Sequence, residues 1–171
     1  MDQHTRELMF AISKGDELRA RALIEAGANI NATKEGGWTA LMLASSDGHE
    51  LCACALIEAG ANINATTKHG ITALMEASLY GHEPCARALI EARANINATG
   101  KDTYNALMLA SAQGHEPCAR ALIEAGANIN ATTKDGMTAL MIASTMGHKP
   151  CARALIGCRE VSHVSGICVC I

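Results

Sequence analysis

The chain has 171 residues, 49% hydrophobic and 18% charged, which is enough apolar content for the packed core of one ordinary domain. It contains only one Phe, one Trp and two Tyr, so Ala, Leu, Ile, Met and Cys must form that core. Such a composition favours closely packed helices over a sheet. The net charge of -3 and the pI near 6.1 argue against nucleic acid as a partner.

The N-terminal sequence MDQHTRELMF lacks the basic start and apolar run of a signal peptide, and no apolar run is long enough to predict a transmembrane helix. We therefore expect a cytoplasmic or nuclear protein, with a membrane location disfavoured. Four of the eight cysteines recur 33 residues apart, and a reducing compartment would keep them as thiols. These four are Cys52, Cys85, Cys118 and Cys151.

The first unit, residues 2–33, has TRELMFAISKGD where later units have their helices. Polar residues replace apolar ones on its expected outer face, as the end of a stacked array requires. These residues are Asp2, Gln3, His4, Arg6, Glu7 and Lys14. This unit is therefore predicted to be an N-terminal cap.

A period of 33 residues divides the following chain into units at 34–66, 67–99 and 100–132, with a truncated unit at 133–156. The phrase ALIEAGANINAT begins at Ala22, Ala55 and Ala121, and ALIEARANINAT begins at Ala88. One such unit cannot bury its apolar face alone, so the units are expected to stack on one another. Residues 157–171 depart from the repeat and are predicted to be a separate C-terminal tail.

Each unit contains the signals of two short helices. In TALMLAS, Leu41, Ala44 and Ser45 share one helix face, and Thr39 is the expected N-cap. Thr72, Asn105 and Thr138 occupy the capping position in the later units. A Gly-His step ends this helix, and prolines in the first turn begin the second, where a missing N–H costs nothing.

Glycines are expected to end the second helices in the left-handed conformation at Gly27, Gly60 and Gly126. In the third unit Arg93 replaces this glycine. A side chain in the left-handed region costs about 1 kcal/mol, so this unit is predicted to be the most strained of the interior ones.

The units resemble the ankyrin repeat. The family signature T-P-L-H-x-A appears as T-A-L-M-x-A from Thr39 and from Thr138, and the G-H, L-I, G-A and I-N-A steps also match. The resemblance covers residues from about 2 to 156. It implies an all-α solenoid of about five repeats, each with two helices and a projecting β-turn, that binds proteins without catalysis. The family's histidine is replaced by methionine, for example at Met42, which predicts softer coupling between units.

Several residue types with potential chemistry recur in every repeat. Histidine and cysteine three residues apart, as in His49 and Cys52, could ligate zinc, but two ligands a unit are too few for a closed site. Core packing is the favoured interpretation of the cysteine, and the histidine resembles the family's turn residue, which binds backbone groups. The methionines at the Met42 position are likewise interpreted as core. Arginines of the second helices are predicted to pair with glutamates four residues later, as in Arg21 and Glu25. We predict no catalytic residue, metal or cofactor.

The informative positions are those that vary between otherwise repeated units, because stacking constrains the rest. By resemblance to the family, the turn tips and the adjoining face of the first helix line the concave side that binds partners. The candidate partner-binding residues are Trp38, Asp47, Ile71, Glu76, Tyr80, Tyr104, Gln113, Met137 and Met146. Alternatively, some of these side chains, Ile71 and Met137 in particular, cover the neighbouring turn.

The sequence thus predicts a monomeric interaction scaffold or adaptor whose partner is another protein. An alternative is a membrane-tethered or regulatory fragment acting through the tail, because Cys168-Val169-Cys170-Ile171 has the outline of a prenylation box. A zinc set of Cys158, His163, Cys168 and Cys170 is a further, weaker possibility.

Overall fold

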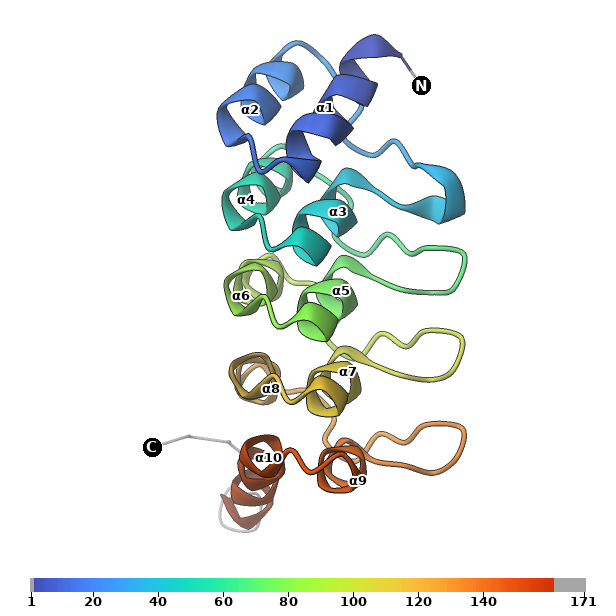
Figure 1. The fold of residues 1–171 in the computed structure, drawn as a ribbon, viewed down its shortest axis with the longest axis vertical. Helices are drawn as coiled ribbons and strands as arrows, with labels where there is room; N and C mark the ends of the chain where they lie inside the picture. Colours follow the sequence, from blue (N-terminus) through green and yellow to red (C-terminus); the bar gives the residue numbers. More distant parts are fainter. Residues whose placement is uncertain (1, 162–171) are drawn as a thin grey trace.

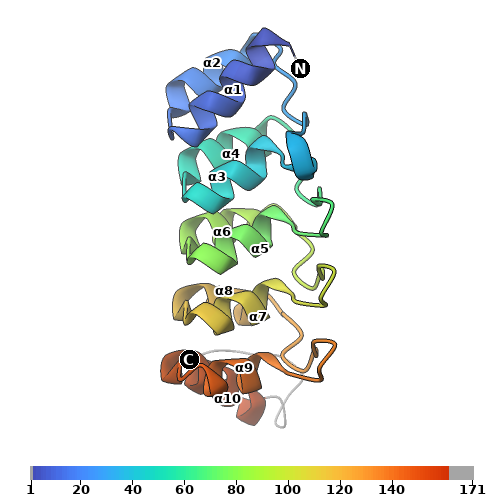
Figure 2. The ribbon, with the colours of Figure 1, turned by 45° about the vertical axis from the view of Figure 1, so that its right-hand side comes forward.

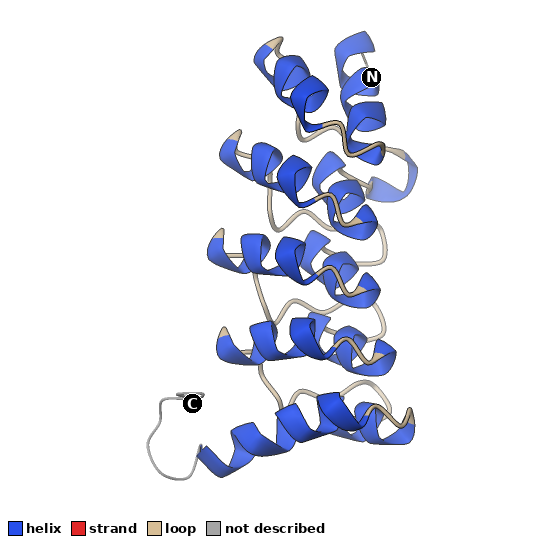
Figure 3. Cartoon of the chain, turned by 60° about the vertical axis from the view of Figure 1, so that its left-hand side comes forward, coloured by secondary structure: helices blue, strands red, loops and turns tan. Residues whose placement is uncertain are grey.

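A computed structural model describes the backbone of residues 2–161 and the side chains up to residue 157. This part of the chain forms ten α-helices, a short 3-10 helix at Glu35–Gly37, and no strand (Figure 3). The helices are α1 Gln3–Ser13, α2 Glu17–Glu25, α3 Ala40–Asp47, α4 Glu50–Glu58, α5 Ala73–Tyr80, α6 Glu83–Glu91, α7 Ala106–Gln113, α8 Glu116–Glu124, α9 Ala139–Thr145 and α10 Lys149–Val161. The all-α class expected from the composition is therefore confirmed.

The helices form antiparallel pairs that stack in a single file (Figures 1 and 2). The first helices make one column, in which α5 packs between α3 and α7, and the second helices make a parallel column. Between successive pairs, a loop projects sideways from the column of first helices (Figure 1). The result is a solenoid in which each pair contacts its neighbours along the chain.

The expected N-caps start the first helices. Thr39 Oγ1 accepts a hydrogen bond from Met42 N at 3.2 Å, and Asn105 Oδ1 accepts one from Met108 N at 2.9 Å. Thr72 and Thr138 cap α5 and α9 in the same way. Each cap satisfies an N–H group that the helix leaves without an internal partner.

The expected glycine at the end of the first helix meets two requirements in α3. Gly48 has φ of 75°, in the left-handed region that glycine adopts readily. A Cβ added there would also lie 2.5 Å from Nδ1 of His82, which belongs to the next pair. Glycine is therefore needed both for the turn and for the close approach of the following helix pair.

The core consists of small and flexible apolar side chains. Met42, Met75 and Met108 are fully buried between neighbouring pairs, and the four periodic cysteines are fully buried too. Burial raises the pKa of Cys85 to about 12 and that of Cys118 to about 11, so both remain neutral thiols. The interpretation of these methionines and cysteines as core is confirmed.

Histidines join neighbouring helix pairs. Nε2 of His82 lies 3.0 Å from the carbonyl oxygen of Ser46, and His115 and His148 reach the carbonyls of Leu79 and Ala112 in the same way. Since a carbonyl can only accept, each Nε2 donates. These bonds confirm that the histidines bind backbone groups.

Asparagines add a second set of links between the pairs. Oδ1 of Asn31 accepts from Asn62 N, and Oδ1 of Asn64 accepts from Asn95 N, each at 2.8 Å. Two kinds of hydrogen bond therefore couple the units at positions other than the methionine that replaces the family's histidine.

The two ends of the stack differ. At the start, Asp16 and Arg19 stand where the next pair has His49 and Cys52, and Arg19 lies 3.5 Å from Glu7. At the other end Met141 is 51% exposed, although it is equivalent to the buried Met42. Helix α10 continues past Ile156 to Val161, so the helix extends beyond the repeat pattern.

The left-handed conformation expected at Arg93 is present, with φ of 67°. Thr103 also lies in this region, with φ of 61°, where the neighbouring loops have Gly70 and Gly136. Thr103 is a left-handed residue that was not predicted from the sequence.

The substitution Arg93→Gly should raise the free energy of unfolding by about 1 kcal/mol, because glycine adopts this conformation without the steric penalty of a Cβ. Urea denaturation followed by circular dichroism would measure the change. Gly126→Ala, at the equivalent position with open space around it, is the matched control and should lower the stability by a similar amount. A loss of stability in Arg93→Gly would contradict the assignment of strain.

Amide hydrogen exchange should be fastest in α9 and in the described part of α10, since within the described residues no further helix pair covers their apolar side chains, such as the exposed Met141, whereas the first pair has polar residues on its outer face. Exchange measured by mass spectrometry of peptic fragments would locate it. Faster exchange in α1 and α2 than in α9 would show that the polar first pair is the weaker end.

Candidate protein-binding face

The first helices and the projecting loops together form one surface, which we call the inner face. It lies on the side of the first helices that faces away from the second helices (Figure 1). Helices α3, α5, α7 and α9 contain no Lys, Arg or His, so this part of the face carries no cationic side chain. Its described charged groups are Asp47 and Glu76.

The four large residues of the turn tips are half-buried and pack against the core. They are Trp38, Ile71, Tyr104 and Met137. The backbone carbonyl of each closes its loop, as in the 2.9 Å bond from Thr67 N to Ile71 O. The tips are also linked to one another, since Lys68 N donates to Gly36 O.

Ile71 lies against the next loop. A Cβ added to Gly100 would be 3.1 Å from Ile71 Cδ1, so the close approach of these loops depends on Gly100. This contact agrees with the alternative in which Ile71 covers the neighbouring turn. Trp38 and Tyr104 contribute aromatic surface at two of the other three tips.

A second row runs along the ends of the first helices at one position of the period. All four of its members are exposed, Tyr80 by 52% and Met146 by 61%. The members are Asp47, Tyr80, Gln113 and Met146. The structure thus brings these four candidates together in one row of accessible side chains that differ in charge and polarity, which we call the exposed strip.

Glu76 is placed differently from the other candidates. Only 5% of its surface is exposed, and burial raises the pKa of its carboxyl. The equivalent positions of the adjacent helices hold Leu43 and Leu109, which are half-buried and pack against the core. Glu76 is therefore a carboxyl group at an otherwise apolar position of the inner face.

Phe10 occupies the same position of the period in α1, although it is not among the predicted partner-binding residues. It is 55% exposed, and Nζ of Lys14 lies 5.7 Å from its ring centroid. The signal that could have found it is the 33-residue spacing from Phe10 through Leu43 to Glu76. The prediction for this irregular first unit is that of a cap only, without a binding residue.

The ion pairs of the second helices correct the sequence prediction. Arg21 Nε lies 2.8 Å from Glu17, and Arg87 and Arg120 likewise pair with Glu83 and Glu116, four residues earlier rather than later. Helical side chains lean toward the N-terminus, so an arginine reaches back along its helix.

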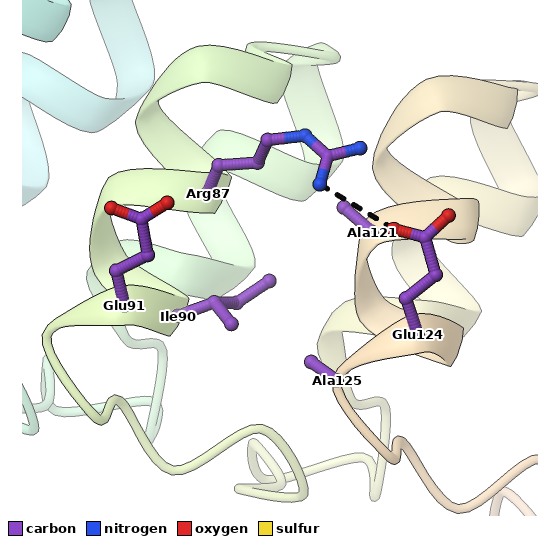
Figure 4. Close-up of a pocket in the computed structure, with 6 residues that line it drawn as sticks. All are labelled: Arg87, Ile90, Glu91, Ala121, Glu124 and Ala125. Atoms are coloured by element: carbon purple, nitrogen blue, oxygen red, sulfur yellow. Dashed lines mark hydrogen bonds and ion pairs between the residues drawn. The ribbon is translucent and has the colours of Figure 1, made fainter. Parts of the chain in front are cut away.

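Arg87 also bridges α6 and α8 through Glu124, at 3.4 Å. Figure 4 shows this pair beside a small hollow lined by alanines and Ile90. Because these pairs are largely exposed, each contributes at most about 1 kcal/mol.

The residues considered for metal binding have other roles where the structure describes them. The histidines donate to carbonyls and the cysteines are core, and within the described chain no three His, Cys, Asp or Glu residues cluster as metal ligands. The possible tail sites at Cys158, His163, Cys168 and Cys170 lie outside the described side chains. Among the helices described, none combines the length and apolar character needed to span a bilayer.

Replacing Glu76 with Leu should stabilise the fold by about 1 to 3 kcal/mol at neutral pH, because a buried carboxyl without a partner is removed. The pKa of the Glu76 carboxyl is raised above its usual 4.5 in the folded protein. The stability that the protonated carboxyl provides is therefore fully present below pH 4.5, and it is lost as the pH rises through the folded pKa. The advantage of Glu76→Gln over the wild type should therefore grow over this range.

Urea unfolding of both proteins at several pH values would measure that difference. Glu91→Gln, an exposed site on a second helix, is the charge-matched control. A difference between Glu76→Gln and the wild type that did not change with pH would show that the carboxyl is well solvated.

Comparison with known proteins supports the arrangement described above. A family model described as ankyrin repeats (3 copies) matches residues 8–100 and again residues 74–164. A search of curated proteins found no significant match. Since the two family matches together span most of the sequence, and the stacked helix pairs have the expected form, the chain belongs to the ankyrin repeat family.

Proposed function

We propose that this chain binds a partner protein through its inner face and turn tips, as a monomeric, non-enzymatic scaffold or adaptor. Ankyrin repeats are generally protein–protein interaction modules and typically lack enzymatic activity. We further propose a cytoplasmic or nuclear location, which the free thiols of the core support, because such cysteines are typical of reducing compartments.

The observation that carries the proposal is the contrast between constant and variable positions. Side chains buried between helix pairs repeat, as in Met42, Met75 and Met108. The exposed strip instead changes from Asp47 to Tyr80 and Gln113. Stacking restricts the first set and leaves the second free to match a partner.

The aromatic residues of the inner face are the expected anchors of binding. Tyr80 is exposed at the centre of the strip, and Trp38 and Tyr104 offer half-exposed rings at the tips. Tyr and Trp are frequent hot-spot residues because their large rings bury much area at a low cost in conformational entropy. A small number of such side chains would supply most of the binding energy.

The variant Trp38→Ala/Tyr80→Ala/Tyr104→Ala should lose partner proteins that the wild type retains in a pull-down from cell extract. Loss of even one hot spot typically weakens binding by about 2 kcal/mol. Circular dichroism would confirm that the variant is folded.

The control is Leu18→Ala/Leu51→Ala, which removes exposed apolar surface from the second helices and should leave binding unchanged. Partners that survive the inner-face variant but disappear with the control would place the binding surface on the second helices. Identical sets of partners for all three proteins would remove the support for the inner face and favour the tail.

A further inference from the structure

We propose that Glu76 selects partner segments that carry a Lys or Arg side chain flanked by apolar residues. This inference rests on the proposed function, because it concerns the chemistry of the segment that the inner face binds.

Glu76 lies on α5, one of the first helices that form the inner face. Its neighbours at the same position of the period, Leu43 and Leu109, are half-buried rather than enclosed, so this row lies at the surface of the first-helix column. Helices α3 and α7 pack on the two sides of α5. A partner side chain reaching this row would meet two leucines with an acidic group between them.

No group in the described part of the chain hydrogen-bonds or forms an ion pair with the Glu76 carboxylate, although the residue is 95% buried. Of the two buried serines at one position of the period nearby, Ser78 donates to the carbonyl of Leu74 at 2.7 Å, whereas Ser111 Oγ has no partner in the described chain. An unpaired buried carboxylate opposes folding, and leucine serves at this position in both adjacent helices. The presence of glutamate at this position is therefore best explained by an ion pair between Glu76 and a cationic side chain of a bound partner.

The surroundings favour a basic side chain over other ligands. The first helices near Glu76 carry no cation that would compete for it, and the nearest charged member of the exposed strip is the acidic Asp47. Tyr80 lies one turn along the same helix face, and 52% of the residue's surface is exposed. A carboxylate beside an accessible aromatic ring suits a guanidinium or ammonium group, through an ion pair and a cation–π contact.

Leu43 and Leu109 offer apolar surface for the aliphatic part of a Lys or Arg side chain. The aliphatic stems of Lys and Arg pack on apolar surface while their heads remain at a polar group. Apolar residues flanking the basic one would cover Leu43 and Leu109. The proposed segment is thus an apolar peptide with one basic residue that aligns it on the face.

The test uses two displayed peptide libraries of about 15 residues, long enough to cross several helices when extended. They are identical except that one contains Lys and Arg and the other has Gln and Met instead. Both are selected on the whole chain. The best binders, and versions with their basic residue changed to Gln, are then titrated against the wild type, Glu76→Gln and Glu91→Gln by fluorescence polarisation.

We expect binders mainly from the basic library, and about a tenfold loss of affinity when their basic residue is changed to Gln. Glu76→Gln should abolish that difference, whereas Glu91→Gln, which removes the same charge from a second helix, should preserve it. Combining the substitution in the peptide with Glu76→Gln in the protein is a double-mutant cycle. It separates the interaction between Glu76 and the basic residue of the peptide from the general attraction of a basic peptide to an acidic protein.

Equal loss on the wild type and Glu76→Gln would overturn the inference. If such peptides are still weakened by Trp38→Ala/Tyr80→Ala/Tyr104→Ala, the proposed inner-face function stands without a role for Glu76. If no selected peptide is weakened by that triple substitution, the proposed function and the inference both fail.

Discussion

Burial of apolar surface between successive helix pairs is the constraint on which this structure depends. Helices of seven to nine residues, such as α9 and α5, are too short to be stable alone, so they persist because a neighbour covers them. Met42 and Cys52 fill the spaces that Ala-rich helices leave when they approach closely. The hydrogen bonds of His82 and Asn31 then fix the register of one pair on the next.

Features that depend on local sequence were predictable, because the cause lies within a few residues. The cap at Thr39 and the left-handed Arg93 follow from residue type and position in the period. The burial of Glu76, the exposure of Phe10 and the pairing of Arg87 with Glu124 depend on neighbouring helices. No pattern within one unit could indicate how far the adjacent pair would cover these side chains.

The inner face shows how a regular scaffold can carry a specific surface. Its helices supply equivalent positions along the array, and the exposed strip holds a different side chain in each helix pair, as Tyr80 and Gln113 show. Glu76 is the exception that opposes stability, since leucine occupies the same place in the neighbouring helices. Residues that cost stability without an internal partner are concentrated at functional sites in many proteins.

The histidine links have a consequence for how such an array can change over generations. His82 and His115 bind the main-chain carbonyls of Ser46 and Leu79, so the link is the same whichever side chain the acceptor residue carries. The three junctions that have this bond are therefore joined in the same way. A gene encoding this chain could gain, lose or reorder whole 33-residue segments, and so recombine its surface residues, without having to evolve a new joint.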